Sequence, residues 1–195
     1  MTGSAWPLRY QLHVVAPHAN DVVVGIGGWL SDHVSAGWKI SVMLSEPVES
    51  LALRVLGIEP TPIDPMAWAC EDTAHVIAME TGLYNRDQDL RRSIDAAIPD
   101  SRKEVLLWGP TAHSLPAQLL HLVRYEPSGA ARAFQTQAVA AAKLAPGSVA
   151  TDETFYPLAR HHGNDQHTRL NANANCDRPR RMTYCPCPYT LATTK

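Results

Sequence analysis

The stretch VVAPHANDVVVGIGGWL, residues 14–30, holds a histidine and an aspartate three positions apart, between an apolar run and a glycine-rich segment. The apolar run belongs to residues 10–16, which are short and rich in β-branched side chains. Such a run predicts a buried strand, and Pro17 ends it. His18 and Asp21 are therefore expected on the loop that leaves the carboxyl end of this strand.

The segment that follows predicts a return to the same sheet. From Gly27 onward apolar residues recur at helical spacing, and residues 39–44 (KISVML) have the composition of a second strand. A strand, helix, strand order with short connections favours a right-handed crossover between parallel strands. Ligands bind outside the carboxyl ends of such strands, which is where we expect His18 and Asp21.

The rest of the chain continues to alternate helices and strands as far as residue 158. The patterns predict helices near 50–57 and over 64–82, 89–98 and 130–144, and strands over 104–108 and 154–158. This alternation predicts an α/β domain over residues 1–158 with a mostly parallel sheet. Residues 159–195 are polar and lack apolar periodicity, so we expect a poorly ordered tail.

Composition restricts the partner and the compartment. A formal net charge of −2 with 18% charged residues gives no electrostatic case for nucleic acid or an anionic membrane, and a small ligand fits better. No apolar run approaches the roughly 20 residues that span a bilayer, and the first residues do not have the pattern of a signal peptide. Three of the four cysteines lie in the tail, which is no disulfide framework. We expect a cytoplasmic protein without a membrane span.

The residue types at the first loop suit a metal ion. An imidazole and a carboxylate are good zinc ligands, and a third histidine from a neighbouring strand end would leave one position open for water, as catalytic zinc sites need. Spacing alone leaves a second interpretation open, in which His18 is a turn histidine and Asp21 caps the helix.

Residues 14–44, VVAPHANDVVVGIGGWLSDHVSAGWKISVML, resemble the opening of the PIG-L/LmbE-like de-N-acetylases. In that family the first strand ends in H-P-D-D-E, followed by G-G-x-L, an Ala-Gly turn and an apolar strand. The resemblance implies a Rossmann-like three-layer α/β domain. It also implies a zinc-dependent hydrolase that removes the acetyl group from an N-acetylglucosamine unit of a small glycoconjugate.

The resemblance carries two zinc ligands over, His18 as the first and Asp21 as the second. Asn20 stands where the family has the aspartate that acts as general base. A carboxamide has no basic site for a proton at neutral pH, whereas an ionised carboxylate accepts one from the attacking water. A general base typically contributes about 10² to 10⁴ in rate, so Asn20 predicts impaired catalysis.

The third ligand departs further from the family. Its second motif, H-x-D-H, follows a strand that corresponds to residues 104–108, but this chain has GPTAHS there, with His113 and no neighbouring aspartate or second histidine. His113 is our predicted third ligand. His167 is the alternative, because it follows a Gly-Asn-Asp run in the tail.

The sequence thus predicts a divergent zinc-dependent deacetylase acting on an N-acetylglucosamine conjugate, with activity reduced by Asn20. The alternative is a non-catalytic protein of the same fold that binds a sugar or another metabolite. A third hypothesis, nucleotide binding, would need backbone amides of residues 25–28 free to hold a phosphate.

Overall fold

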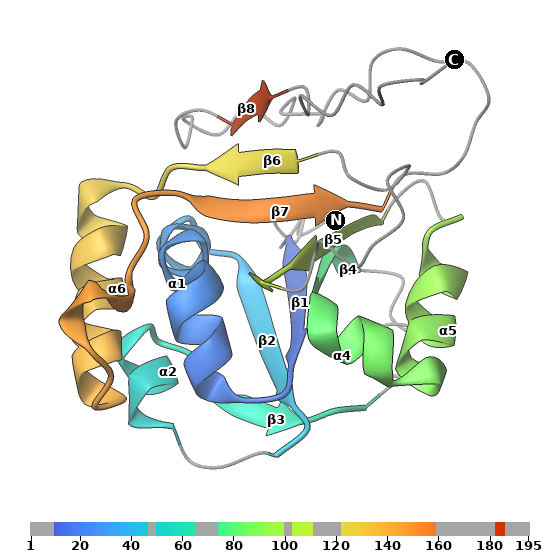
Figure 1. The fold of residues 1–195 in the computed structure, drawn as a ribbon, viewed down its shortest axis with the longest axis horizontal. Coiled ribbons are helices and arrows are strands. Elements are labelled where there is room, and N and C mark those ends of the chain that lie inside the picture. The colour runs from blue at the N-terminus through green and yellow to red at the C-terminus, as the bar shows by residue number, and fades with distance from the viewer. Residues whose placement is uncertain are drawn as a thin grey trace, which may run out of the picture.

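The computed structural model describes residues 10–46, 50–64, 74–99, 103–110, 122–158 and 182–185, and within these ranges eight strands form one sheet in the order β3-β2-β1-β4-β5-β7-β6-β8 (Figure 1). The strands are β1 (Gln11–Ala16), β2 (Lys39–Leu44), β3 (Pro60–Pro62), β4 (Ala74–Glu80), β5 (Glu104–Trp108), β6 (Leu122–Tyr125), β7 (Glu153–Pro157) and β8 (Met182–Cys185). The helices are α1 (Ala19–Ser35), α2 (Leu51–Val55), α4 (Thr81–Arg86), α5 (Gln88–Ala97) and α6 (Gly129–Ala141), with a short 3₁₀ turn at Pro146–Ser148.

The sheet has a parallel half and an antiparallel half. Strands β3, β2, β1, β4 and β5 pair in parallel, whereas β7 and β6 continue the sheet in antiparallel fashion. From β1 the chain adds β2 and then β3 on one side of β1. It then crosses to the other side of β1, where it adds β4 and β5, so the order of the strands changes direction at β1. The expected α/β fold, a Rossmann-like three-layer domain with a mostly parallel sheet, is confirmed.

Two hydrophobic cores lie on opposite faces of the sheet, because side chains alternate along each strand. On β1, Leu12 and Val14 pack with α1, α2 and α6, whereas Val15 packs with α4 and α5. The same two groups of helices flank the sheet in Figure 1. None of the helices in the described ranges is long and apolar enough to cross a membrane.

Two sequence-based expectations about helices need correction. Helix α1 begins at Ala19, not near Gly27, so Asn20 and Asp21 lie in its first turn instead of on a loop. The prediction of a helix over 64–82 is wrong for the second half of that range, because Ala74–Glu80 forms the central strand β4. A strand buried on both faces has a nearly continuous apolar run, and its alanines also fit a helical stripe. Residues 65–73 lie outside the described ranges.

Besides β4, three further strands were not predicted from the sequence. β3 and β6 are short, and β8 comes from the predicted tail and pairs with β6. Residues 182–185 therefore contribute to the sheet, and the rest of the tail, 159–181 and 186–195, lies outside the described ranges. The domain boundary after Leu158 stays a prediction.

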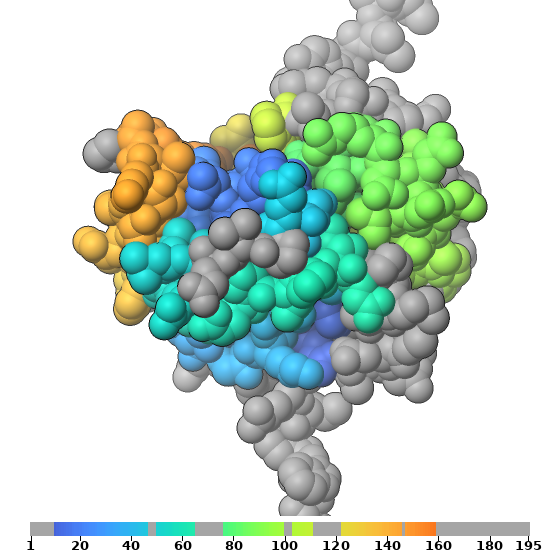
Figure 2. All heavy atoms as spheres, turned by 90° about the horizontal axis from the view of Figure 1, so that it is seen from below, coloured from blue at the N-terminus to red at the C-terminus, as the bar shows by residue number. Residues whose placement is uncertain are grey.

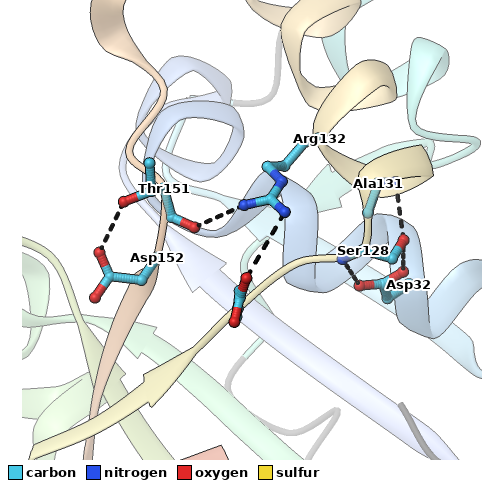
Figure 3. A network of polar contacts seen from close by, with 7 residues as sticks. Asp32, Ser128, Ala131, Arg132, Thr151 and Asp152 are labelled. Carbon is cyan, nitrogen blue, oxygen red and sulfur yellow. Dashed lines mark hydrogen bonds and ion pairs between the residues drawn. The ribbon is translucent and has the colours of Figure 1, made fainter. Parts of the chain in front are cut away.

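Helix α6 is anchored to α1 by a carboxylate. Asp32 accepts hydrogen bonds from the hydroxyl of Tyr125 at 2.8 Å, the hydroxyl of Ser128 at 2.6 Å and the backbone N–H of Ser128 at 2.9 Å. The Ser128 hydroxyl in turn accepts the N–H of Ala131 and caps α6 (Figure 3). These contacts hold the start of α6 against α1, which brings the middle of the two helices into contact as well.

Candidate metal-binding edge

The register of the parallel strands aligns their carboxyl ends at one edge of the sheet. Ala16 of β1 pairs with Leu44 of β2, and Glu80 of β4 pairs with Trp108 of β5. The chain leaves β1 and β2 side by side, and the two segments that follow, the start of α1 and residues 45–46, adjoin at the surface seen from below in Figure 2. This is the edge at which a doubly wound sheet binds its ligands.

His18 and Asp21 lie at the entrance to α1. His18 occupies the position just before the helix in an extended conformation (φ −135°, ψ 152°), and its side chain makes no capping hydrogen bond. Its imidazole is exposed, and Asn20 in the first turn is exposed as well. Asp21 is the acidic residue of that turn, where a carboxylate is stabilised by the helix dipole. The N-cap position is thus occupied by His18, and the alternative in which Asp21 caps the helix is wrong, because Asp21 lies inside the first turn.

A third polar side chain, Glu46, lies near His18 on the segment that follows β2. Nδ1 of His18 lies 3.9 Å from a carboxylate oxygen of Glu46, and the two side chains are 58% and 73% exposed. Such an exposed pair adds little to stability. Sequence reasoning missed Glu46, although a usable signal exists: Glu46 follows Leu44 by two residues, as His18 follows its partner Ala16 by two.

The described residues alone do not complete a metal site. No group of three His, Cys, Asp or Glu side chains among them is arranged to hold an ion. His113 and His167, the predicted third ligand and its alternative, both lie outside the described ranges.

The chain leaves the sheet at different edges before these two histidines, after β5 for His113 and after β7 for His167. β5 ends at the same edge as β1, two strand spacings or about 10 Å away. His113 follows Trp108 by five residues, which span up to about 17 Å when extended. β7 runs in the opposite direction, and Leu158 after it bonds to Val105 near the far end of β5. The chain toward His167 therefore leaves β7 at the opposite edge of the sheet, and His167 follows Leu158 by nine residues.

The middle of the edge is occupied by structural hydrogen bonds. The buried carboxylate of Glu80 accepts the N–H groups of Gly82 and Leu83 at 2.7 Å each and caps α4. The hydroxyl of Thr81 donates to the carbonyl oxygen of Trp108 at 2.8 Å and joins the ends of β4 and β5. Gly109 has a φ of +110°, and a Cβ there would lie 2.9 Å from Glu80 Oε1. Glu80 is thus committed to holding this part of the edge.

The glycine-rich segment serves packing and not phosphate binding. Gly27 and Gly28 are buried inside α1, and a Cβ on Gly28 would lie 2.6 Å from Cγ of Pro127. The N–H of Gly28 is donated to the carboxylate of Glu153 at 2.8 Å. The nucleotide hypothesis needed free amides in this segment, so the structure contradicts it.

Comparison with known proteins places this arrangement in a structural context. No protein-family model and no curated protein matches the chain. The deacetylase–teicoplanin complex of the teicoplanin biosynthesis pathway superposes with a TM-score of 0.54 at 12% identity, over 76% of this chain and 98% of that one. The A40926 pseudoaglycone deacetylase Dbv21 gives a TM-score of 0.52 at 15% identity, over 80% and 100% of the two chains.

This chain has the fold of these deacetylases. The likeness is one of fold alone at such identities. The comparison therefore establishes the fold, and the activity, the metal and the substrate of this chain belong to the proposed function.

Proposed function

We propose that this protein is a divergent zinc-dependent deacetylase that acts on the N-acetyl group of an N-acetylglucosamine conjugate, with activity reduced by Asn20. The single observation that carries the proposal is the coincidence of two independent features. A chain with a deacetylase-type fold has a histidine and an aspartate at the carboxyl edge of β1, the position where the resemblance puts the metal. We include a cytoplasmic location and a small glycoconjugate partner in the proposal.

His18 and Asp21 fit two positions of a zinc site. The imidazole is exposed and makes no capping bond, and the carboxylate lies one helical turn further on. Metal-binding histidines usually donate their second ring N–H to a carboxylate, and Glu46, whose carboxylate lies 3.9 Å from Nδ1 of His18, would accept that bond after a small side-chain movement. Nε2 of His18 would then face the metal. The third ligand in the proposal is His113, with His167 as the alternative.

Zinc bound by these residues would polarise the acetamide carbonyl and make water more acidic. Asn20, exposed in the first turn of α1, orients a water molecule or a sugar hydroxyl through its amide. It accepts no proton from the attacking water, so this step relies on a group outside the motif. The expected outcome is slow hydrolysis.

The alternative is a non-catalytic protein of the same fold that binds a sugar or another metabolite. Asn20 favours it, because the amide keeps the hydrogen-bonding capacity of the position and removes its basicity. Under this alternative the metal and the sugar pocket can persist without hydrolysis.

Metal analysis of the full chain, purified without an affinity tag, tests the proposal. We expect one zinc per chain, lost in Asp21→Ala. Asp89→Ala is the matched control, because Asp89 is the acidic residue in the first turn of α5 and its loss removes the same helix-dipole interaction. The release of acetate from N-acetylglucosamine conjugates, followed with and without added zinc, separates the enzyme from the binding protein. A wild-type chain that binds no zinc, or an Asp21→Ala chain that retains it, would overturn the proposal.

A further inference from the structure

Helix α1 is broken in the middle. Ile26 has φ −144° and ψ 16°, far from helical values, and separates a first half, Ala19–Gly25, from a second half, Gly27–Ser35. In a continuous helix the N–H of Gly28 would bond to the carbonyl of Val24, four residues earlier. A break of this kind leaves buried backbone groups that need other partners.

Two buried side chains from distant elements supply those partners. Glu153 of β7 accepts the N–H of Gly28 through Oε1 at 2.8 Å and the N–H of Trp29 through Oε2 at 2.7 Å. Gln135 of α6 donates through Nε2 to the carbonyl of Val23 at 3.0 Å and lies 3.4 Å from that of Val24. Glu153 thus caps the second half of α1, and Gln135 satisfies the end of the first half.

The two side chains also bind each other. Nε2 of Gln135 lies 3.1 Å from Oε1 of Glu153, and the residues are 0% and 3% exposed. The glycines of α1 make room for them, since a Cβ on Gly27 would lie 3.1 Å from Cγ of Gln135. Taking a carboxylate out of water is unfavourable unless it is fully hydrogen-bonded, and here three N–H donors surround it. Burial raises the pKa of Glu153 to about 8, and the hydrogen bonds from Trp29, Gly28 and Gln135 oppose that rise.

We propose that Glu153 and Gln135 are positioning residues that fix the angle between the two halves of α1 and so hold His18, Asn20 and Asp21 at the carboxyl edge of β1. The first half of α1 carries these site residues, and its far end is held by the contacts at the break. The inference rests on the proposed function only for the role of His18 and Asp21 as metal ligands. The structural coupling between Glu153 and the first half of α1 does not depend on it.

Glu153→Gln and Gln135→Met test this role in the full chain. The first variant turns a carboxylate oxygen into an NH₂ group that faces an N–H donor, and the second removes the side-chain donor to the carbonyl of Val23. Ile94→Ala is the destabilised control, because Ile94 is fully buried in the core on the other face of the sheet, in a cluster that contains no residue of α1. All chains are compared at a temperature well below their melting points.

Two measurements separate positioning from general loss of stability. Hydrogen exchange of the amides in Ala19–Gly25 should be about tenfold faster in both variants than in Ile94→Ala at matched melting temperature. Titration with Co²⁺, followed by its visible absorption, should give an affinity lower by about tenfold and an altered spectrum in the two variants only. Exchange rates and spectra indistinguishable from those of Ile94→Ala would overturn the proposal. If the wild-type chain binds neither Zn²⁺ nor Co²⁺, the metal-dependent function fails, and hydrogen exchange alone still decides the positioning role.

Discussion

Gly25 lies so close to Trp108 that a Cβ on the glycine would be 2.7 Å from Cζ3 and 2.8 Å from Cε3 of the indole ring. Trp108 is the last residue of β5 and is 1% exposed, so its ring cannot move into solvent without opening the core. Gly25 belongs to the half of α1 that carries the candidate ligands. The absence of a side chain at this position therefore sets how closely that half approaches the sheet.

Gly25→Ala should destabilise the protein although alanine is the better helix former. The propensity gain is about 1 kcal/mol, but forcing a methyl group into the packed ring contact costs about 1–3 kcal/mol and displaces α1. Gly129→Ala is the control, since Gly129 begins α6 and a Cβ there meets nothing within 4 Å. Urea unfolding should give a lower free energy of unfolding for Gly25→Ala and no loss for Gly129→Ala. Equal values for both variants would show that the indole yields freely.

The elements that the sequence predicted well are those whose pattern is local. Residues 39–44 and 104–108 are short apolar runs between clear breaks, and both form strands with those bounds. The prediction for residues 74–80 was wrong because an alanine-containing apolar run fits both the buried stripe of a helix and a central strand. Only the pairing of these residues with β1 and β5 determines that they form a strand.

In the candidate site, too, the residues in a local sequence motif were predicted, and the residues that act through contacts between separate elements were not. His18 and Asp21 were found because they share one short motif with a known family. Glu46 and Glu153 were missed, since each gains its role from a contact between separate elements, and Glu153 lies 125 residues from the N–H group of Gly28 that it accepts. The position of Glu46 after β2 gives a weak signal for its contact, whereas the sequence gives no local signal for the pairing of Glu153 with Gly28.

Asp32→Ala should weaken the junction of α1 and α6. The change leaves three donors, the hydroxyls of Tyr125 and Ser128 and the N–H of Ser128, without their shared acceptor. We expect a loss of about 2 kcal/mol in the free energy of unfolding, measured with urea. Asp152→Ala removes an exposed ion pair to Arg124 at 3.1 Å and should change stability by less than about 1 kcal/mol. A loss for Asp152→Ala as large as that for Asp32→Ala would contradict this account.

Glu104→Gln should change how stability depends on pH. Burial at the start of β5 raises the pKa of Glu104 to about 7, from an unperturbed 4.5. A carboxyl group with a raised folded-state pKa stabilises the protein fully below the unfolded pKa, and this contribution is lost as pH rises through about 7. The amide variant loses no such contribution, so its stability relative to wild type should improve by about 2 kcal/mol between pH 5 and pH 8. Thermal unfolding at both pH values measures it, and a pH-independent difference would contradict the expectation.

Asn20→Asp should raise hydrolysis of an N-acetylglucosamine conjugate by about 10² or more, because it restores a carboxylate that can take a proton from the attacking water. Asp and Asn are nearly the same shape, and the exposed first turn of α1 accommodates the added charge at the helix end where negative charge is favourable. Acetate release by zinc-supplemented protein is the measurement. His18→Ala in the same background should abolish the gain, and Asn85→Asp, which adds the same charge in α4, should produce none. A zinc-loaded Asn20→Asp chain whose rate stays at background with several conjugates would remove the impaired enzyme from consideration and leave the binding protein, because the missing contribution would then lie in transition-state stabilisation that no base can replace.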